Sequence, residues 1–234
     1  MLFEVRENPH HYDNLHYDHD NDNDNEQICI RQQPPIGGHP VSVQPIQMPL
    51  CQRDSSQLLI IDAQERLARA MPTEELEQVV ANINRLITAA KVFGIPVIVT
   101  QQNSKGLGPI IESIGLNLPP DTQATEKTAY SCCTAPGFER SISAHPGRRQ
   151  LIVVGMEAHI CISQTVAGLQ RWGYQVFVPA DAIISRKEVW KANVLDRMRA
   201  GGVQVSCTES VAFEWIGDSA QEHFREVWSL FRNQ

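Results

Sequence analysis

A cysteine in the middle of the chain has the position expected of a nucleophile. Residues 151–154 (LIVV) form a short apolar run, rich in β-branched side chains, that is typical of a strand buried on both faces of a parallel sheet. Gly155 permits a turn, and apolar residues at helical spacing from Ile160 onward predict a helix that Gly173 ends. Cys161 would then lie in the first turn of this helix, where unpaired backbone N–H groups and the helix dipole favour a thiolate. The pattern indicates thiolate chemistry.

Position alone fits a structural cysteine as well, because most free cysteines behave as small buried hydrophobic residues. A nucleophile also needs a basic or cationic partner. Two charged residues qualify: Asp62 directly follows a strand predicted over 57–61, and Lys127 follows a weaker strand predicted over 122–126. The carboxyl ends of parallel strands meet at one sheet edge, so both could converge there with Cys161. Taken singly, each is equally typical of a helix cap or a solvated surface charge.

The order of the predicted elements indicates the fold class. Strands predicted at 57–61, 97–100, 122–126, 151–154, 175–178 and 203–206 alternate with helices, including a long one that starts within 72–75 and is stopped by Gly94, and another over 188–200. This alternation predicts a three-layer α/β fold with a doubly wound, six-stranded parallel sheet of Rossmann-like order 3-2-1-4-5-6. Right-handed crossovers then place strands one and four side by side. Ser219 and Glu222, in capping-box spacing, predict the start of the last helix.

Composition limits the classes of partner. The chain is 42% hydrophobic, which is enough for the core of one domain, but no apolar run approaches the roughly 18 residues of a membrane span. Six cysteines without regular spacing, and an N-terminus without the pattern of a secretory signal, predict reduced thiols and a cytoplasmic location. The net charge of −7 comes with no basic block, so neither nucleic acid nor a membrane is an expected partner.

Residues 1–54 differ in composition from the rest of the chain. We predict a disordered tail, rich in acidic residues, histidine and asparagine, followed by a proline-rich linker, and then a single domain over 55–234. The tail histidines are candidates for weak divalent metal binding, and a short apolar alternation in the linker is a candidate edge strand. These residues are His10, His11, His16 and His19, and Val41, Val43 and Ile46.

From about residue 54 onward the chain resembles the isochorismatase-like cysteine hydrolases, a family that also includes nicotinamidases and carbamoylsarcosine amidases. The likeness rests on the segments LLIIDAQERL, IPVIVTQQNSKGLGP, EKTAYSC and VVGMEAHICISQTVAGLQRWGYQVFVPADAIISR, and it is greatest to the branch of isochorismatase domain-containing proteins. The resemblance implies that Cys161 is the nucleophile, Asp62 the acid/base carboxylate and Lys127 the third catalytic residue. It also implies a cis peptide between Met156 and Glu157, and an oxyanion hole built from the backbone N–H groups of Glu157 and Cys161.

The chemistry implied is hydrolysis through a thioester on Cys161, with Asp62 taking the thiol proton and Lys127 lowering the thiol pKa. Nicotinamidases carry an Asp-x-His metal motif where this chain has Gln101-Gln102-Asn103, so neither a metal nor another cofactor is expected. True isochorismatases replace the cysteine, which this chain keeps. The resemblance therefore indicates a metal-independent hydrolase, acting on a C–N bond or related bond of a small amide, ureide or ester.

Four residues are candidates for the substrate pocket: Gln64, Gln101, Tyr130 and His159, of which His159 fits a structural hydrogen bond in the turn at least as well. The family also implies a homo-oligomer, a dimer or a tetramer. Two alternatives stay open. One is a scaffold or binding protein that keeps the fold but has little turnover. The other is a redox-sensing thiol, which requires Cys132 or Cys133 to lie near enough to resolve an oxidised Cys161.

Overall fold

A computed structural model of the chain describes residues 48–232. The predicted tail, its histidines and the candidate edge strand lie outside the described residues. Residues 48–54, assigned to the linker, are described: Cys51 is buried, and its backbone N–H donates to a carboxylate oxygen of Glu214 at 2.6 Å. The backbone N–H of Gln52 donates to Oε1 of Gln150, also at 2.6 Å. The end of the linker therefore packs on the domain, although the boundary at residue 54 stays a prediction.

The sheet has the predicted order, and its strand pairs are all parallel. Its strands are β1 (Ser56–Ile61), β2 (Val97–Gln102), β3 (Ala124–Lys127), β4 (Gln150–Met156), β5 (Gln175–Pro179), β6 (Ile183–Ile184) and β7 (Gln204–Ser206). The order is β3-β2-β1-β4-β5-β7, with β6 paired to β4, so the sixth predicted strand is β7. The two residues of β6 are too few to show a strand pattern in the sequence. The predicted doubly wound α/β class is confirmed.

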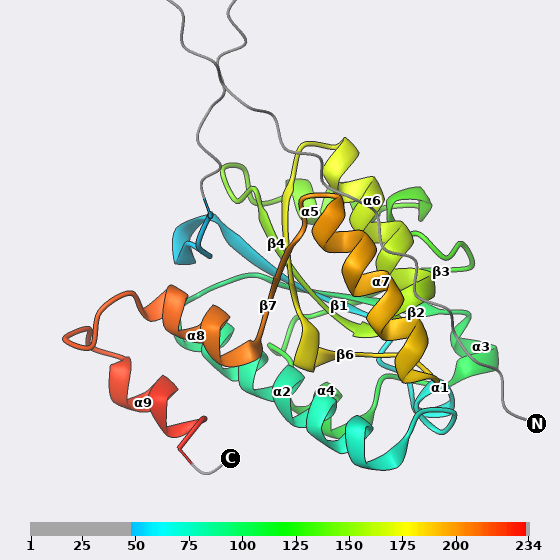
Figure 1. Cartoon of the computed structure of the whole chain (residues 1–234), viewed down its shortest axis with the longest axis horizontal. Coiled ribbons are helices and arrows are strands. Elements are labelled where there is room, and N and C mark those ends of the chain that lie inside the picture. The colour runs from blue at the N-terminus through cyan, green and yellow to red at the C-terminus, as the bar shows by residue number, and fades with distance from the viewer. Residues whose placement is uncertain (1–47, 233–234) are drawn as a thin grey trace, which may run out of the picture. The chain divides into compact units, whose positions relative to one another are not determined.

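Helices cover both faces of this sheet (Figure 1). They are α1 (Glu65–Ala68), α2 (Thr73–Val92), α3 (Ser104–Leu107), α4 (Glu112–Asn117), α5 (Phe138–Ser143), α6 (Ser163–Arg171), α7 (Glu188–Ala200), α8 (Thr208–Ile216) and α9 (Phe224–Ser229), with short 3-10 turns η1 (Arg53–Ser55), η2 (Cys132–Thr134) and η4 (Ala180–Ala182) and the π-helical turn η3 (Ala158–Ile162). The predicted capping box is wrong: α9 begins at Phe224, because Asp218 instead organises a turn by accepting from the backbone N–H of Ala220.

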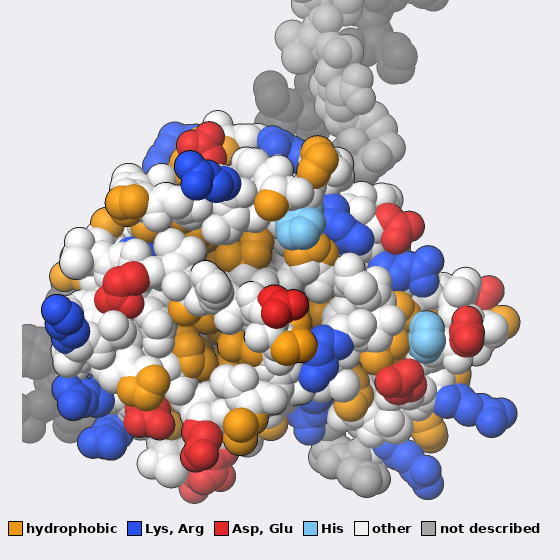
Figure 2. Space-filling view, turned by 180° about the vertical axis from the view of Figure 1, so that it is seen from behind, with side chains coloured by type: hydrophobic (Ala, Val, Ile, Leu, Met, Phe, Trp, Pro, Cys, Tyr) orange, Lys and Arg blue, Asp and Glu red, His pale blue; other side chains and the backbone are white. Residues whose placement is uncertain are grey.

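Alternate residues of the central strands serve two separate cores. Leu58 and Ile60 of β1 pack with α2 and α8, whereas Leu59 and Ile61 pack with α5, α6 and α7. Both faces of the strand are therefore buried, which explains its continuous apolar run. Seen from behind the view of Figure 1, the surface mixes charges of both signs with scattered apolar side chains (Figure 2). Within residues 48–232, no helix has the length and apolarity that crossing a bilayer requires.

One glycine sets the distance between the two central strands near their carboxyl ends. Gly155 in β4 pairs with Ile61 of β1 and has φ +114°, a conformation that favours glycine. A Cβ atom at this position would overlap the carbonyl oxygen of Ile61. The close approach joins the end of β1, where Asp62 follows, to the end of β4, which leads toward Cys161.

Gly155→Ala is therefore expected to lower the free energy of unfolding by about 2–5 kcal/mol, because the new methyl group meets backbone and the backbone conformation becomes strained. Gly115→Ala in α4 is the matched control, since no atom lies within 4 Å of its added Cβ. Alanine is favoured over glycine inside a helix, so the control should gain about 0.5–1 kcal/mol. Urea denaturation measures both. Equal stabilities for the two variants would contradict this account of Gly155.

Candidate active site

Asp62 lies at the carboxyl end of β1 and is fully buried. Its Oδ1 accepts a hydrogen bond from Oγ1 of Thr100 at 2.8 Å, and its Oδ2 accepts from Nζ of Lys127 at 2.6 Å. Its φ of +50° is uncommon for a residue other than glycine, and such conformations cluster at functional sites. The carboxylate is thus held from two neighbouring strands at the sheet edge that the topology predicts.

Lys127 is the last residue of β3, and its side chain is also fully buried. Besides Asp62, its Nζ donates to Oε1 of Gln102 at 2.7 Å and approaches the carbonyl oxygens of Ala129 at 3.2 Å and Tyr130 at 3.3 Å. A buried charge is costly unless it is paired and hydrogen-bonded. Here one carboxylate and three neutral acceptors surround the ammonium group, so its hydrogen-bonding needs are met inside the protein.

Cys161 lies in the π-helical turn η3, not in the first turn of an α-helix as predicted, because α6 begins only at Ser163. The carbonyl oxygen of Glu157 accepts from the N–H groups of both Ile160 and Ile162, which widens the turn. π-Helical turns occur frequently at functional sites. The cysteine is 5% exposed, so its thiol belongs to the interior of the protein.

The thiol pKa is shifted in the direction opposite to the prediction. Burial raises the pKa of Cys161 above its usual range, and the charge and hydrogen bond of Asp62 raise it further. The positive charge of Lys127 lowers the pKa by a smaller amount. Burial of the thiol, which the residue pattern does not reveal, outweighs the effect of the lysine. At neutral pH the arrangement therefore holds a protonated thiol beside a carboxylate.

The structure brings only one of the two adjacent cysteines to this place. The Sγ of Cys132 donates to Oγ1 of Thr100 at 3.7 Å, and burial raises the pKa of this thiol to about 11. Its backbone N–H donates to the hydroxyl of Thr165 at 3.0 Å, and that hydroxyl donates to the carbonyl oxygen of Cys161 at 2.7 Å. Cys133 instead directs its thiol to the carbonyl oxygen of Thr165 at 3.6 Å. Of the two, Cys132 is the neighbour that the redox alternative would need.

Two glutamines predicted for the substrate pocket have other places. Gln64 is fully buried; its Nε2 donates to the carbonyl oxygens of Gln102 and Gly108 at 3.2 and 2.7 Å, and its Oε1 accepts from the N–H of Gln102 at 2.7 Å. Both polar atoms of its side chain therefore form hydrogen bonds with backbone groups, and neither is left for a substrate. Gln101 lies between Thr100 and Gln102 in β2, so its side chain points to the opposite face of the sheet.

The residues that sequence reasoning missed are Thr100 and Gln102, which hold Asp62 and Lys127 respectively. Strand alternation carried the signal, because residues two apart in β2 share a face. If Thr100 faces Asp62, Gln102 must lie on the same face of the strand. The prediction of Gln101 as a pocket residue does not follow this periodicity.

The other two pocket candidates lie near the cluster in different environments. Tyr130 is 57% exposed, although its carbonyl oxygen approaches Lys127. His159 places Nδ1 2.9 Å from Oγ of Ser185 and packs its ring against Trp190, with 4.8 Å between ring centroids. Burial lowers the pKa of His159, so the ring favours its neutral form. These contacts agree with the interpretation that His159 forms a structural hydrogen bond.

The turn before Cys161 contains the cis peptide that the resemblance implies, between Met156 and Glu157. The Glu157 side chain is buried, and its Oε2 accepts from the backbone N–H of Arg186 at 3.1 Å and from its Nε at 3.0 Å. Glu157 is therefore held in place through its side chain.

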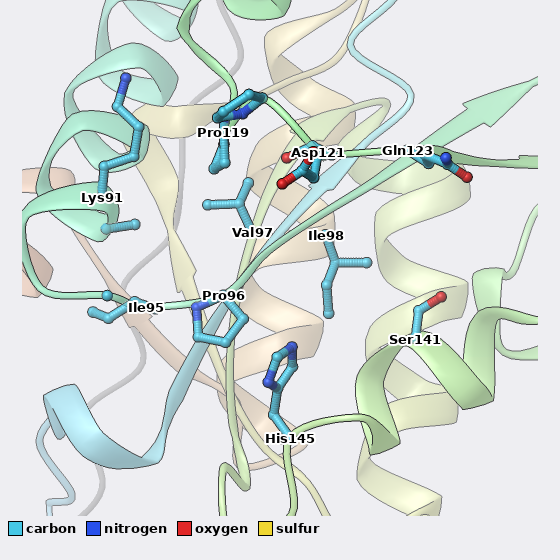
Figure 3. Close-up of a pocket in the computed structure, with 14 residues that line it drawn as sticks. Lys91, Ile95, Pro96, Val97, Ile98, Pro119, Asp121, Gln123, Ser141 and His145 are labelled. Atoms are coloured by element: carbon cyan, nitrogen blue, oxygen red, sulfur yellow. The ribbon is translucent and has the colours of Figure 1, made fainter.

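A cavity of about 650 Å³ lies elsewhere, beside the start of β2. Its apolar wall includes Val97 and Ile98, and in Figure 3 His145 and Asp121 approach it from opposite sides. This cavity lies at the amino end of β2, whereas the candidate catalytic residues lie at or beyond the carboxyl ends of their strands. None of Asp62, Lys127 and Cys161 lines the cavity. The cavity is therefore separate from the Asp62–Lys127–Cys161 cluster.

Fold and site together define a doubly wound α/β protein with a buried carboxylate, ammonium and thiol at the sheet edge. The model of the "Isochorismatase domain" family matches residues 56–210. Isochorismatase domain-containing protein 2 of Xenopus laevis is 34% identical over 176 residues, which cover 75% of this chain and 83% of that protein. The chain belongs to the isochorismatase family, as its motifs predict.

Solved structures agree with this assignment. MAR1 ribonuclease from Caenorhabditis elegans has a TM-score of 0.73 and 30% identity, covering 78% of this chain and 92% of that one. The YcaC gene product of Escherichia coli, described as an octameric hydrolase of unknown specificity, has a TM-score of 0.72 at 23% identity, covering 79% and 91% of the two chains. The latter likeness shows the fold alone.

Breaking the buried ion pair should strongly destabilise the domain. Lys127→Met leaves the Asp62 carboxylate buried without its cation, and we expect a loss of about 3–5 kcal/mol in the free energy of unfolding. Adding Asp62→Asn in the double variant removes the unpaired charge and should restore part of the loss. Denaturant titration of the single and double variants measures the coupling.

A matched control exists in the ion pair between Lys191 and Glu75, which has the same length of 2.6 Å but keeps 11% and 26% of its side-chain surfaces exposed. Solvent reaches part of this pair, so Lys191→Met should cost clearly less than Lys127→Met. Similar losses in both single variants would contradict the importance given to burial of the Asp62–Lys127 pair.

Proposed function

We propose that the protein is a metal-independent cysteine hydrolase that cleaves a small amide, ureide or ester through a thioester on Cys161. The observation that carries the proposal is the Asp62 carboxylate, buried, paired with Lys127 and interacting with the thiol of Cys161. Membership of the isochorismatase family supports the hydrolase class. A base, a cation and a nucleophile that are all buried together have a clear joint use in attack on a carbonyl.

In the first half of the proposed reaction, Sγ of Cys161 attacks the carbonyl carbon while its proton passes to Asp62. The carbonyl oxygen becomes negative, and the backbone N–H groups of Glu157 and Cys161 stabilise it. When the C–N or C–O bond breaks, the leaving group takes the proton from Asp62. The acyl group stays on sulfur as a thioester.

In the second half, a water molecule attacks the thioester and gives a proton to Asp62. The C–S bond breaks, the acid product leaves, and Cys161 recovers the proton from Asp62. Lys127 takes no part in these proton transfers. Its ammonium group holds the Asp62 carboxylate in place and compensates the negative charge of the thiolate as that charge develops.

A raised thiol pKa suits this sequence of steps. The resting site holds one cation and one anion with a neutral thiol, so no further charge is buried between turnovers. The thiolate forms only when the proton moves to Asp62, during the attack itself. The proposal thus assigns activation of the nucleophile to a base rather than to a stable thiolate.

The donor set around the cluster favours a reaction that uses no metal. Across residues 48–232, no three or more His, Cys, Asp or Glu side chains gather closely enough to hold a metal ion. Gln101, Gln102 and Asn103 occupy the place of the Asp-x-His motif of nicotinamidases. Water attack is therefore assigned to Asp62 as the base.

The burial of Cys161 bears on the kind of substrate. Its 5% exposure favours a small molecule over a polymer as the partner, although the similar C. elegans protein is named a ribonuclease. The predicted homo-oligomer is kept as part of the proposal, supported by the octamer described for the E. coli protein. The cytoplasmic location stays a prediction.

Hydrolysis of a panel of small amides, ureides and esters tests the proposal, together with mass spectrometry of acid-quenched protein. We expect turnover of at least one compound, an acyl adduct on Cys161, and a loss of at least about 10³-fold in Cys161→Ala. Cys207→Ala is the control, because this cysteine is exposed and follows β7, which β5 separates from β4; it should keep full activity.

Turnover that survives Cys161→Ala would sink the cysteine mechanism. A folded wild-type protein that hydrolyses none of the compounds and forms no adduct would leave the scaffold or binding reading ahead. Both outcomes are read from the same samples, so the two hypotheses are separated directly.

A further inference from the structure

We infer that Gln102 is a positioning residue: its uncharged side chain holds Lys127 against Asp62 and keeps the buried site at one cation and one anion. The inference deepens the proposed function and rests on it for the meaning of the site. Its geometric basis does not depend on any substrate.

The side-chain amide of Gln102 is fixed at both ends. Its Oε1 accepts from Nζ of Lys127 at 2.7 Å, and its Nε2 donates to the carbonyl oxygen of Thr128, also at 2.7 Å. The donor bond to Thr128 determines which end of the amide faces the ammonium group, so the oxygen is presented to Lys127. Gln102 and Lys127 are also direct partners in the register of β2 and β3.

The backbone of Gln102 is held as firmly as its side chain. The buried Gln64 accepts from the N–H of Gln102 at 2.7 Å and donates to its carbonyl oxygen at 3.2 Å. Gln64 lies two residues after Asp62, so this pair of hydrogen bonds ties the end of β2 to the segment that carries the carboxylate. The four residues Gln64, Gln102, Lys127 and Asp62 form a closed ring of contacts around the end of the sheet.

The chemistry of an amide fits this place better than the alternatives of similar size. A glutamate would put two carboxylates around one ammonium, and like charges that share a buried site favour retention of a proton. The extra anion would also hold the proton of Cys161 more tightly. A methionine would remove one acceptor from Lys127 and leave the Thr128 carbonyl without its donor. The amide alone supplies an acceptor and a donor without adding charge.

The test is the pH dependence of iodoacetamide labelling of Cys161, read by mass spectrometry of the peptide. For Gln102→Glu we expect labelling about tenfold slower at a given pH below the midpoint, which corresponds to a midpoint about one pH unit higher than in the wild type. Gln101→Glu is the matched control. It adds the same charge one residue away, on the opposite face of β2, and its labelling rate should match that of the wild type.

Gln102→Met keeps the inference testable if the glutamate variant does not fold. The positive charge of Lys127 lowers the pKa of Cys161, and loss of the acceptor leaves Lys127 less firmly held. Labelling of Gln102→Met should therefore slow by about threefold, which is less than the change expected for Gln102→Glu. Melting temperatures of all variants establish that the folded state is being labelled. A merely structural role for Gln102 would change the melting temperature and leave the midpoint in place.

Wild-type labelling in both Gln102 variants would overturn the inference, and so would an equal shift in Gln102→Glu and Gln101→Glu. The assay needs no substrate. If the labelling midpoint shifts only in the Gln102 variants and the protein hydrolyses nothing, the proposed hydrolase is rejected and the role of Gln102 is kept. If the protein turns over a substrate but the midpoint does not shift, the hydrolase is kept and the role of Gln102 is rejected.

Discussion

The ion pair between Asp62 and Lys127 is the constraint on which the site depends. Two opposite charges with fully buried side chains are tolerated only when each is paired and hydrogen-bonded. Thr100 and Gln102, both in β2, complete those bonds from the strand between β1 and β3. Three adjacent strands must therefore end at the same level, and the parallel sheet provides that arrangement.

Burial and the same pair together set the pKa of the thiol. Burial raises the pKa of Cys161 most, Asp62 raises it further, and the positive charge of Lys127 offsets these effects only in part. The site is buried and pairs one cation with one anion, and in the proposed mechanism the nucleophile forms only as Asp62 takes the thiol proton. Helix position, which predicts a stable thiolate, is outweighed by desolvation and by the neighbouring carboxylate.

The sequence predicts the sheet well where local signals are strong. The apolar runs of β1 and β4 were found within one or two residues, and α7 was found over 188–200, where Gly201 and Gly202 end it. Strand β6 and the π-helical turn were missed, because they depend on pairing with distant backbone and on bonds to Glu157 rather than on any residue pattern. Within the site, Asp62, Lys127 and Cys161 could be found from strand ends and family motifs. The places of Gln64 and Gln102 required the actual register, and the catalytic roles stay predictions.

The most direct measurement is the pH dependence of iodoacetamide labelling of Cys161 in the wild type and in Asp62→Asn. If the carboxylate holds the thiol proton, its removal leaves Lys127 beside the sulfur, where Gln102 and two carbonyl groups still satisfy the ammonium. We expect the labelling midpoint to lie above the ordinary thiol range in the wild type and to fall in the variant, with labelling at least about tenfold faster at pH 7. A midpoint that stays in place, or rises, in Asp62→Asn would contradict control of Cys161 by the buried ion pair.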